Sequence, residues 1–419
     1  METKTLFPGI NLNVQREDRF KSEYLSVNFI LSGKLYERAH ASLLSPVMLC
    51  GCEKYPNEQS LESALLDLYD ADLFCDGYAL GESFIKPFAL TCPIDRYLPQ
   101  GANVRGEARD LLFEFMLHPL VSNGGFKKKN VANQKKNRLD RLKGEKTDRP
   151  RYATRKCFEL LFEGEDCVYT TAQYKKDLKS VTPESLYAFY QKMLSRAQIE
   201  IFYFGPEEPS ALEEDLRTRL APLFTPKDEL TKDVVSVPKN AVKRGFEALP
   251  GQQSTLCIGY KTPVVMGHPD YTALCLAREM LCLSPSSLIF SNVREKQSLC
   301  YYCADRLLPR KGGYILFSGI DGAAAEKAER AIDEQFESLK NGDFDERLFL
   351  ESKRMMTNGL LAMYDSPQAT EGWYMRRRLA EGNGTPEQTI EAIAALKRED
   401  VLRAAQSFTK DCVFLLKNK

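Results

Sequence analysis

The guanidinium of Arg294 and the phenol of Tyr301 are side chains that could donate hydrogen bonds to a bound ligand. Apolar residues recur at helical spacing just before Arg294, which predicts a short helix that begins after Ser286 or Ser287. An aromatic-rich strand is predicted at residues 299–306. The two donors would then lie at one helix-to-strand corner, where both can be aimed at a ligand. The same pattern also fits a solvated helix face, because an Arg-Glu-Lys run usually faces water.

The ordered string around these two residues resembles the second-half signature of the insulinase/pitrilysin-like (inverzincin) metallopeptidases, Ser-Ser-x-Leu-Phe-x-x-Val-Arg-Glu-Lys-x-Gly-Leu-x-Tyr. Identities in one ungapped window fall at Ser286, Ser287, Phe290, Val293, Arg294, Glu295, Lys296, Leu299 and Tyr301. Leu288 stands where a basic residue is common, Ile289 replaces leucine, and Ser298 replaces the usual glycine. The resemblance implies that Arg294 holds the substrate chain and that Tyr301 donates a hydrogen bond to the carbonyl oxygen under attack.

The elements that must position this corner occur twice along the chain. The first half predicts strand, helix, helix, paired strands and helix at residues 24–31, 35–50, 60–68, 72–91 and 108–117. The second half predicts the same order at residues 255–261, 271–283, 287–297, 300–306 with 314–319, and 323–339. Each half also ends with a capped helix and a closing strand, at residues 182–190 with 198–204 and at residues 397–405 with 411–416. The repeat predicts an α+β fold of two homologous domains, each a sheet with helices on one side.

The length of 419 residues agrees with two domains, because a single core rarely grows so large. Residues 225–244 are polar, contain Pro226 and Pro238 and lack helical periodicity, so they predict the join. We expect an N-terminal domain at residues 1–224, this linker, and a C-terminal domain with the Arg/Tyr motif at residues 245–419. A mobile join between homologous halves would make a clamshell, which the family resemblance also implies.

The first half lacks the residues that the resemblance implies for a zinc site. Enzymes of this family carry an inverted motif, His-x-x-Glu-His, in which two imidazoles bind Zn²⁺ and the glutamate is the general base. Residues 48–52 align best with the family's Met-Leu-Phe-x-Gly-Thr segment, which puts the three motif positions at Ser42, Ser45 and Pro46. None of these side chains can ligate zinc or act as a base. We therefore expect no metal or other cofactor in this chain.

The remaining candidates for zinc ligands are also missing from the sequence. The family's further glutamate is expected at residues 131–138, which read Val-Ala-Asn-Gln-Lys-Lys-Asn-Arg. The histidines, His40, His118 and His268, stand far apart and in no ligand spacing. We expect His118 and His268 to be cap or turn residues.

On these grounds the chain resembles the zinc-less partners of the insulinase-like family, in which one chain keeps the metal and the other keeps the Arg/Tyr pair. It looks closest to the zinc-less member of the paired bacterial proteins described as associated with elongation factor P modification. The resemblance implies a heterodimer with a zinc-bearing relative, a peptide substrate, and no catalysis by this chain alone. The alternative is a peptide- or protein-binding adaptor that has no part in hydrolysis.

Composition and charge limit the other classes of function. Lys+Arg and Asp+Glu are equal at 58 each, so the overall charge favours no particular partner. The N-terminal stretch lacks a signal-peptide pattern, and no run of about 18 apolar residues could span a membrane. We therefore expect a cytoplasmic protein whose 12 cysteines are reduced.

Two cysteine spacings could carry chemistry. Cys50 and Cys52 are one residue apart without a second pair nearby, which is a poor metal pattern. Cys300 and Cys303 have the spacing of a redox couple, but on the predicted strand their side chains point to opposite faces. The expected role of the second pair is strand packing.

A basic segment and an aromatic-arginine segment remain. Residues 127–156 hold 13 Lys+Arg against 3 Asp+Glu, which fits a solvated helix, a docking face for an acidic partner or, last, nucleic-acid binding. Trp373 stands beside Arg376 and Arg377 on a predicted helix. The two guanidiniums could meet a peptide carboxylate, or Trp373 could pack in the core beside a wet face.

Overall fold

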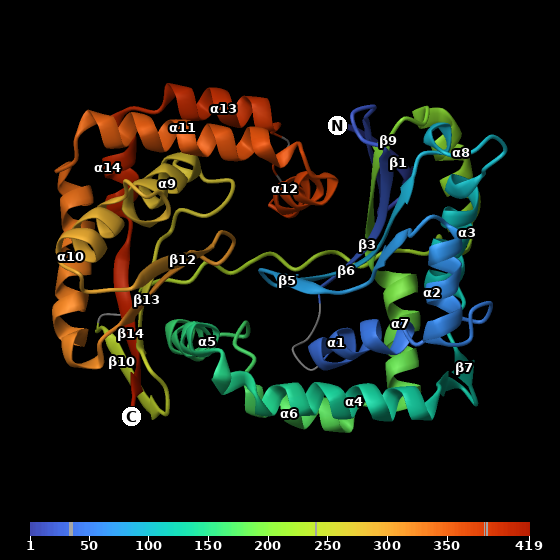
Figure 1. Cartoon of the computed structure of the whole chain (residues 1–419), viewed down its shortest axis with the longest axis horizontal. Coiled ribbons are helices and arrows are strands. Elements are labelled where there is room, and N and C mark those ends of the chain that lie inside the picture. The colour runs from blue at the N-terminus through green and yellow to red at the C-terminus, as the bar shows by residue number, and fades with distance from the viewer. Residues whose placement is uncertain (33–36, 239–240, 381, 383) are drawn as a thin grey trace. The chain divides into compact units, whose positions relative to one another are not determined.

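The computed structural model describes residues 1–32, 37–238, 241–380, 382 and 384–419. These residues form two compact units, which Figure 1 draws. Unit 1 comprises Met1–Lys143 and Tyr169–Lys232, and unit 2 comprises Gly144–Val168 and Asp233–Lys419.

The units differ from the predicted domains in one segment. Residues 144–168 lie in the first half of the sequence, yet they fold with unit 2. Their helix, α5 (Arg149–Leu161), contacts the sheet of unit 2. In its described part, the predicted linker at residues 225–244 has no helix or strand before β10 (Lys243–Leu249).

The sheet of unit 1 has the strand order β1-β2-β9-β3-β6-β4, and β5 pairs with the start of β6. The strands are β1 (Glu2–Phe7), β2 (Ile10–Arg16), β3 (Ser22–Ser32), β4 (Asp72–Phe74), β5 (Tyr78–Leu80), β6 (Ser83–Pro93) and β9 (Gln198–Gly205). β2 and β9 are parallel, and the other neighbours are antiparallel. The strand predicted at residues 24–31 is confirmed within β3, whereas β1 and β2 were not predicted.

Helices of unit 1 hold the degenerate zinc motif. They are α1 (Glu37–Met48), α2 (Glu58–Asp67), α3 (Val104–Leu117), α4 (Lys128–Lys143), α6 (Thr171–Ser180), α7 (Pro183–Arg196) and α8 (Pro209–Leu220), with a short hairpin of β7 (Val121–Ser122) and β8 (Gly125–Phe126). α1 packs against α4, α6 and α7. The predicted cap of α7 is confirmed, because the Thr182 side chain accepts the N–H of Ser185 and the Ser185 hydroxyl accepts the N–H of Thr182.

Two leucines of α2 differ in burial. Leu66 on α2 is 64% exposed, whereas Leu61 is buried. The two leucines are five residues apart, which is about 140° around a helix of 3.6 residues per turn. A single helix face cannot bury both.

The sheet of unit 2 has the order β10-β14-β11-β13-β12, which repeats the order β2-β9-β3-β6-β4 of unit 1. Its further strands are β11 (Ser254–Lys261), β12 (Tyr302–Leu308), β13 (Gly313–Ile320) and β14 (Thr409–Asn418). The closing strand of each half is parallel to one neighbour and antiparallel to the other: β9 lies between β2 and β3, and β14 lies between β10 and β11. The shared topology confirms two homologous α+β domains.

Unit 2 contributes most of the remaining helices. They are α9 (Tyr271–Arg278), α10 (Ala325–Asn341), α11 (Glu346–Met363), α12 (Pro367–Leu379), α13 (Pro386–Ala395) and α14 (Arg398–Gln406). Two π-helices, η4 (Glu279–Leu283) and η5 (Ile289–Lys296), follow α9, so the helix predicted at residues 271–283 is α9 continued as η4. No helix among the described residues combines the length and the apolar character that a membrane crossing needs.

Helices cover both faces of the unit 2 sheet, which corrects the prediction of helices on one side. Leu256 and Ile258 of β11 join the core that includes α9, α10 and α14, whereas Cys257 between them packs in the cluster that includes α5. Successive strand side chains point to opposite faces, so a fully buried strand such as β11 needs cover on both sides. Figure 1 shows α5 and α10 on opposite sides of β13 and β14.

Candidate functional site

Arg294 and Tyr301 flank one sharp turn in unit 2. Arg294 belongs to η5, and its carbonyl oxygen accepts a hydrogen bond from the N–H of Ser298 at 3.0 Å. Ser298 adopts a left-handed φ of 52°, and the N–H of Tyr301 then donates to the carbonyl of Gly319 on β13 at 2.8 Å. The predicted helix-to-strand corner is present, although its strand β12 begins later than predicted, at Tyr302. π-helices are rare in proteins as a whole, and those that do occur often lie at functional sites.

The side chains of both residues are accessible. The guanidinium of Arg294 lies over the ring of Phe290, with its central carbon 4.5 Å from the ring centroid. Its nearest carboxylate contact is a long ion pair of 3.7 Å with Glu295, and the Arg294 side chain is 40% exposed. Tyr301 is 60% exposed. Each side chain can therefore present hydrogen-bond donors to a ligand.

The cysteines beside this corner behave as packing residues. The thiol of Cys303 lies 3.6 Å from that of Cys282 on η4. Burial raises the pKa of Cys300 to about 11, and the nearby Arg294 guanidinium acts in the opposite direction. A high thiol pKa suppresses the thiolate that redox exchange requires. The expectation that Cys300 and Cys303 do not form a couple agrees with this geometry.

The first position of the zinc motif, Ser42 on α1, belongs to a chain of hydrogen bonds. The Ser42 hydroxyl donates to the carbonyl of Ala39 at 3.0 Å and lies 2.6 Å from the hydroxyl of Tyr174 on α6. Nε of Arg138 on α4 donates to the same tyrosine hydroxyl at 2.9 Å. Arg138 comes from residues 131–138, where the family's further glutamate is expected. A cation therefore stands in the segment that would supply an anionic ligand.

The second position, Ser45, is buried and accepts a hydrogen bond from Nζ of Lys86 on β6. Lys86 is 1% exposed, and this burial lowers its pKa. The thiol of Cys75 also interacts with the Lys86 amine. The sequence signal for this cluster is a lysine among apolar neighbours in the mostly apolar strand β6.

The third position, Pro46, lies near the end of α1 and is half-buried. Proline has no N–H to donate to the carbonyl of Ser42 four residues earlier, and the helix ends at Met48. Proline is tolerated here because α1 stops within its next turn.

The described residues do not fit a zinc ion at these positions. Zinc takes thiolate, imidazole or carboxylate ligands, and the motif offers two hydroxyls and a proline. The guanidinium of Arg138 donates to the Tyr174 hydroxyl beside Ser42, and this cation would repel Zn²⁺. His40 lies 3.1 Å from the hydroxyl of Ser185 instead. In the part of the chain that the structure describes, no group of three or more His, Cys, Asp or Glu is placed to hold a metal ion.

The other histidines have the predicted local roles. His118 is the C-cap residue of α3, and its N–H donates to the carbonyl of Glu114. Nδ1 of His268 accepts the N–H of Asp270 at 3.1 Å, in the turn that precedes α9.

The basic segment at residues 127–156 is divided between the two units. In unit 1, Lys135 on α4 donates to the carbonyl of Val181 after α6 at 2.6 Å. In unit 2, Lys146 pairs with Glu247 and Arg155 pairs with Glu145, each at 2.8 Å. Partial neutralisation of this kind is typical of a solvated helix rather than of a single basic docking face.

Comparisons with known proteins agree with the geometry. A family model described as "Peptidase M16 inactive domain" matches residues 180–356, which include Arg294 and Tyr301. The "Probable inactive metalloprotease YmfF" of Bacillus subtilis is 25% identical over 420 residues, covering 99% of this chain and 97% of that protein.

Solved structures share the fold over the whole chain. A conserved protein from Enterococcus faecalis has a TM-score of 0.89 and 26% identity, covering 100% of this chain and 98% of that one. A peptidase M16 inactive domain from Pseudomonas fluorescens has a TM-score of 0.82 at 15% identity, with the same coverage. The matched family model, the full-length relative and the loss of all three zinc-motif side chains lead to one conclusion. The chain is similar to inactive, peptidase-like proteins of the peptidase M16 family: residues 180–356 match the family model, and the similarity to the Bacillus subtilis relative extends over 99% of the chain.

Proposed function

We propose that this chain is the non-catalytic subunit of a two-chain peptidase. It binds peptide and contributes Arg294 and Tyr301 to the active site of a zinc-bearing partner from the same family. The observation that carries the proposal is a contrast between two motifs. The side chains of Arg294 and Tyr301 are accessible at a sharp turn, whereas the zinc-motif hydroxyls are engaged in internal hydrogen bonds.

Each of the two donors has its own task in the joint site. The guanidinium of Arg294 presents parallel N–H groups, which suit the oxygens of an extended peptide. Its contact with the ring of Phe290 limits the side chain's freedom before substrate arrives, and this lowers the entropy cost of binding. The phenol of Tyr301 donates to the carbonyl oxygen that becomes an oxyanion. The partner supplies the metal and the general base.

We further propose that this complex works in the cytoplasm. The thiols of Cys157 and Cys412 lie 3.7 Å apart in unit 2, and all 12 cysteines are free. Close, unjoined thiols are typical of a reducing compartment.

The test is co-expression of this chain with the zinc-bearing insulinase-like relative from the same genome. We expect the two chains to co-purify in equal amounts and to hydrolyse peptides together in a chelator-sensitive way. The isolated chain should hydrolyse nothing. Two results would count against the proposal: chelator-sensitive hydrolysis by the pure isolated chain, or full activity of the relative with no association between the chains.

A further inference from the structure

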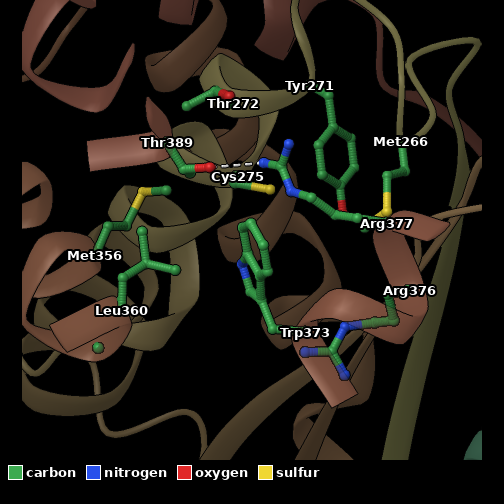
Figure 2. A pocket seen from close by; sticks show the side chains of 11 residues that line it. Met266, Tyr271, Thr272, Cys275, Met356, Leu360, Trp373, Arg376, Arg377 and Thr389 are labelled. Carbon is green, nitrogen blue, oxygen red and sulfur yellow. Dashed lines mark hydrogen bonds between the residues drawn. The ribbon is translucent and has the colours of Figure 1, made fainter. Parts of the chain in front are cut away.

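Unit 2 contains an apolar pocket with a cavity volume of about 270 Å³, formed by α9, α11, α12, α13 and the loop before α9 (Figure 2). Trp373 of α12 forms one wall, and Met356 and Leu360 of α11 lie across from it, as Figure 2 shows. Trp373 is 9% exposed, so the packing role expected for it is present, but its ring also faces this cavity.

The wall of the pocket contains a half-buried cationic group, the guanidinium of Arg377. Its central carbon lies 4.5 Å from the ring centroid of Trp373, and its Nη2 donates to the hydroxyl of Thr389 at 2.7 Å. Figure 2 shows this guanidinium between Thr389 and the ring of Tyr271. Arg376, the next residue, also contributes to the lining but is exposed.

Arg377 is half-buried, yet the described residues give it no carboxylate partner. Burial lowers the pKa of Arg377. The ionised forms of Tyr271, Cys275 and Tyr374 act on this pKa in the opposite direction. Within the described residues, no ion pair joins Arg377 to an Asp or Glu side chain. Thr389 accepts from one of the five N–H donors of Arg377, and even a partly buried charge is stabilised when an anion or several hydrogen bonds compensate it.

Gly359 on α11 leaves room in the pocket for a ligand. It lies inside the helix at a position where glycine costs about 0.5–1 kcal/mol relative to alanine. A Cβ atom at Gly359 would meet nothing within 4 Å, so packing does not require a glycine here. A side chain at this exposed lining position would therefore have room to extend.

We propose that this pocket binds a molecule that joins one apolar group to one carboxylate. The apolar group lies between Trp373 and the α11 side chains, and the carboxylate accepts hydrogen bonds from Arg377. The volume is below the roughly 300–1,000 Å³ of pockets for drug-sized ligands, so it suits a single residue-sized group. Such a group is either the last residue of a peptide with an apolar C-terminus or a short free acid.

The chain has a single tryptophan, so the intrinsic fluorescence of Trp373 reports directly on this pocket. The full-length chain is titrated with four probes: a tetrapeptide ending in leucine, its C-terminal amide, N-acetyl-leucine and hexanoate. Calorimetry provides a second measurement of binding. We expect at least one of the acids to change the fluorescence in a saturable way. If the peptide acid binds, its amide should bind at least about tenfold more weakly. Binding of the peptide acid identifies a chain end as the source, and binding of the small acids alone identifies a free acid.

Two variants test the two halves of the pocket. Arg377→Met removes the charge but keeps an unbranched apolar side chain, and it should weaken acid binding by about tenfold or more. Gly359→Leu should fill the cavity and abolish binding, while the melting temperature stays equal or rises because leucine favours a helix over glycine. Arg354→Met is the matched control, because Arg354 is an exposed residue of α11 outside the lining.

The proposal is overturned if none of the acids binds by either method, or if the peptide acid and its amide bind equally. It is also overturned if folded Gly359→Leu binds as the unchanged chain does. These outcomes are independent of the zinc-bearing partner, because every measurement uses this chain alone.

Discussion

The hydroxyl groups of Ser42 and Tyr174 lie 2.6 Å apart, and Ser42 is the position that the sequence resemblance predicts for the first histidine of a zinc motif. The same tyrosine accepts a hydrogen bond from Arg138, so three helices of unit 1 meet at this point. The hydrogen bonds join α1 to α6 and α4 without a metal. The position contributes to packing, while the residues proposed to act on substrate stand in the other unit.

The first prediction concerns metal content. The purified chain should hold far less than one zinc per chain after dialysis, because its motif positions are Ser42, Ser45 and Pro46 and Arg138 adds a positive charge. Elemental analysis measures this directly. About one zinc per chain would show that the motif alignment is wrong.

The second prediction concerns Tyr301. In the reconstituted pair, Tyr301→Phe should lower peptide turnover by about 10²–10³, because it removes one donor to the developing oxyanion. Complex formation should be unchanged, since only an exposed hydroxyl is lost. Hydrolysis rates and the melting temperature of each preparation are recorded together.

The third prediction concerns Arg294. Arg294→Ala should raise KM as well as lower kcat, because a guanidinium that holds the peptide contributes to substrate binding. Lys296→Ala, two residues further on the exposed face of η5, and Arg330→Ala, an exposed arginine of α10, are the controls. If the variants of both Arg294 and Tyr301 support normal turnover, the adaptor hypothesis replaces the proposed function.

The fourth prediction concerns the turn between the proposed substrate residues. Ser298 has a φ of 52°, where a Cβ atom costs about 1 kcal/mol or more. Ser298→Gly should therefore raise the free energy of unfolding by about 0.5–1 kcal/mol, and denaturant unfolding can measure the change. Ser291→Gly, inside η5, should have the opposite sign. A destabilised Ser298→Gly variant would contradict the conformational argument.

The fifth prediction concerns the pH dependence of stability at Lys86. Burial lowers the pKa of Lys86 from its usual 10.5, so between the folded and the unfolded pKa the unfolded chain binds more protons. The stability of the unchanged chain should therefore rise relative to Lys86→Met as the pH increases through that window. Unfolding curves from pH 7 to about pH 10 measure the difference. Lys176→Met, at an exposed lysine of α6, should show no such trend.

Local sequence patterns predict the secondary-structure elements and show which zinc-binding side chains the expected motif positions lack. The short apolar run in β11 and the cap at Thr182 predict a strand and a helix from neighbouring residues alone, since these signals depend on the local sequence and nearby hydrogen bonds. The identities of Ser42, Ser45 and Pro46 likewise exclude zinc ligation by these three side chains without any knowledge of the fold. The Arg294–Tyr301 corner was predictable because both residues belong to one short ordered string.

Tertiary structure decided which distant residues meet. Residues 144–168 pack in unit 2, where Cys157 contacts Cys412 across 255 residues of sequence, and no local period encodes such a contact. The bond from Lys86 to Ser45 likewise joins a strand to a helix 41 residues earlier. Arg376 and Arg377 are neighbours with the same side chain, but their environments differ. Arg376 faces solvent, whereas Arg377 lies between Trp373 and Thr389. Burial depends on the elements that cover a residue, and that arrangement is formed only when the whole unit folds.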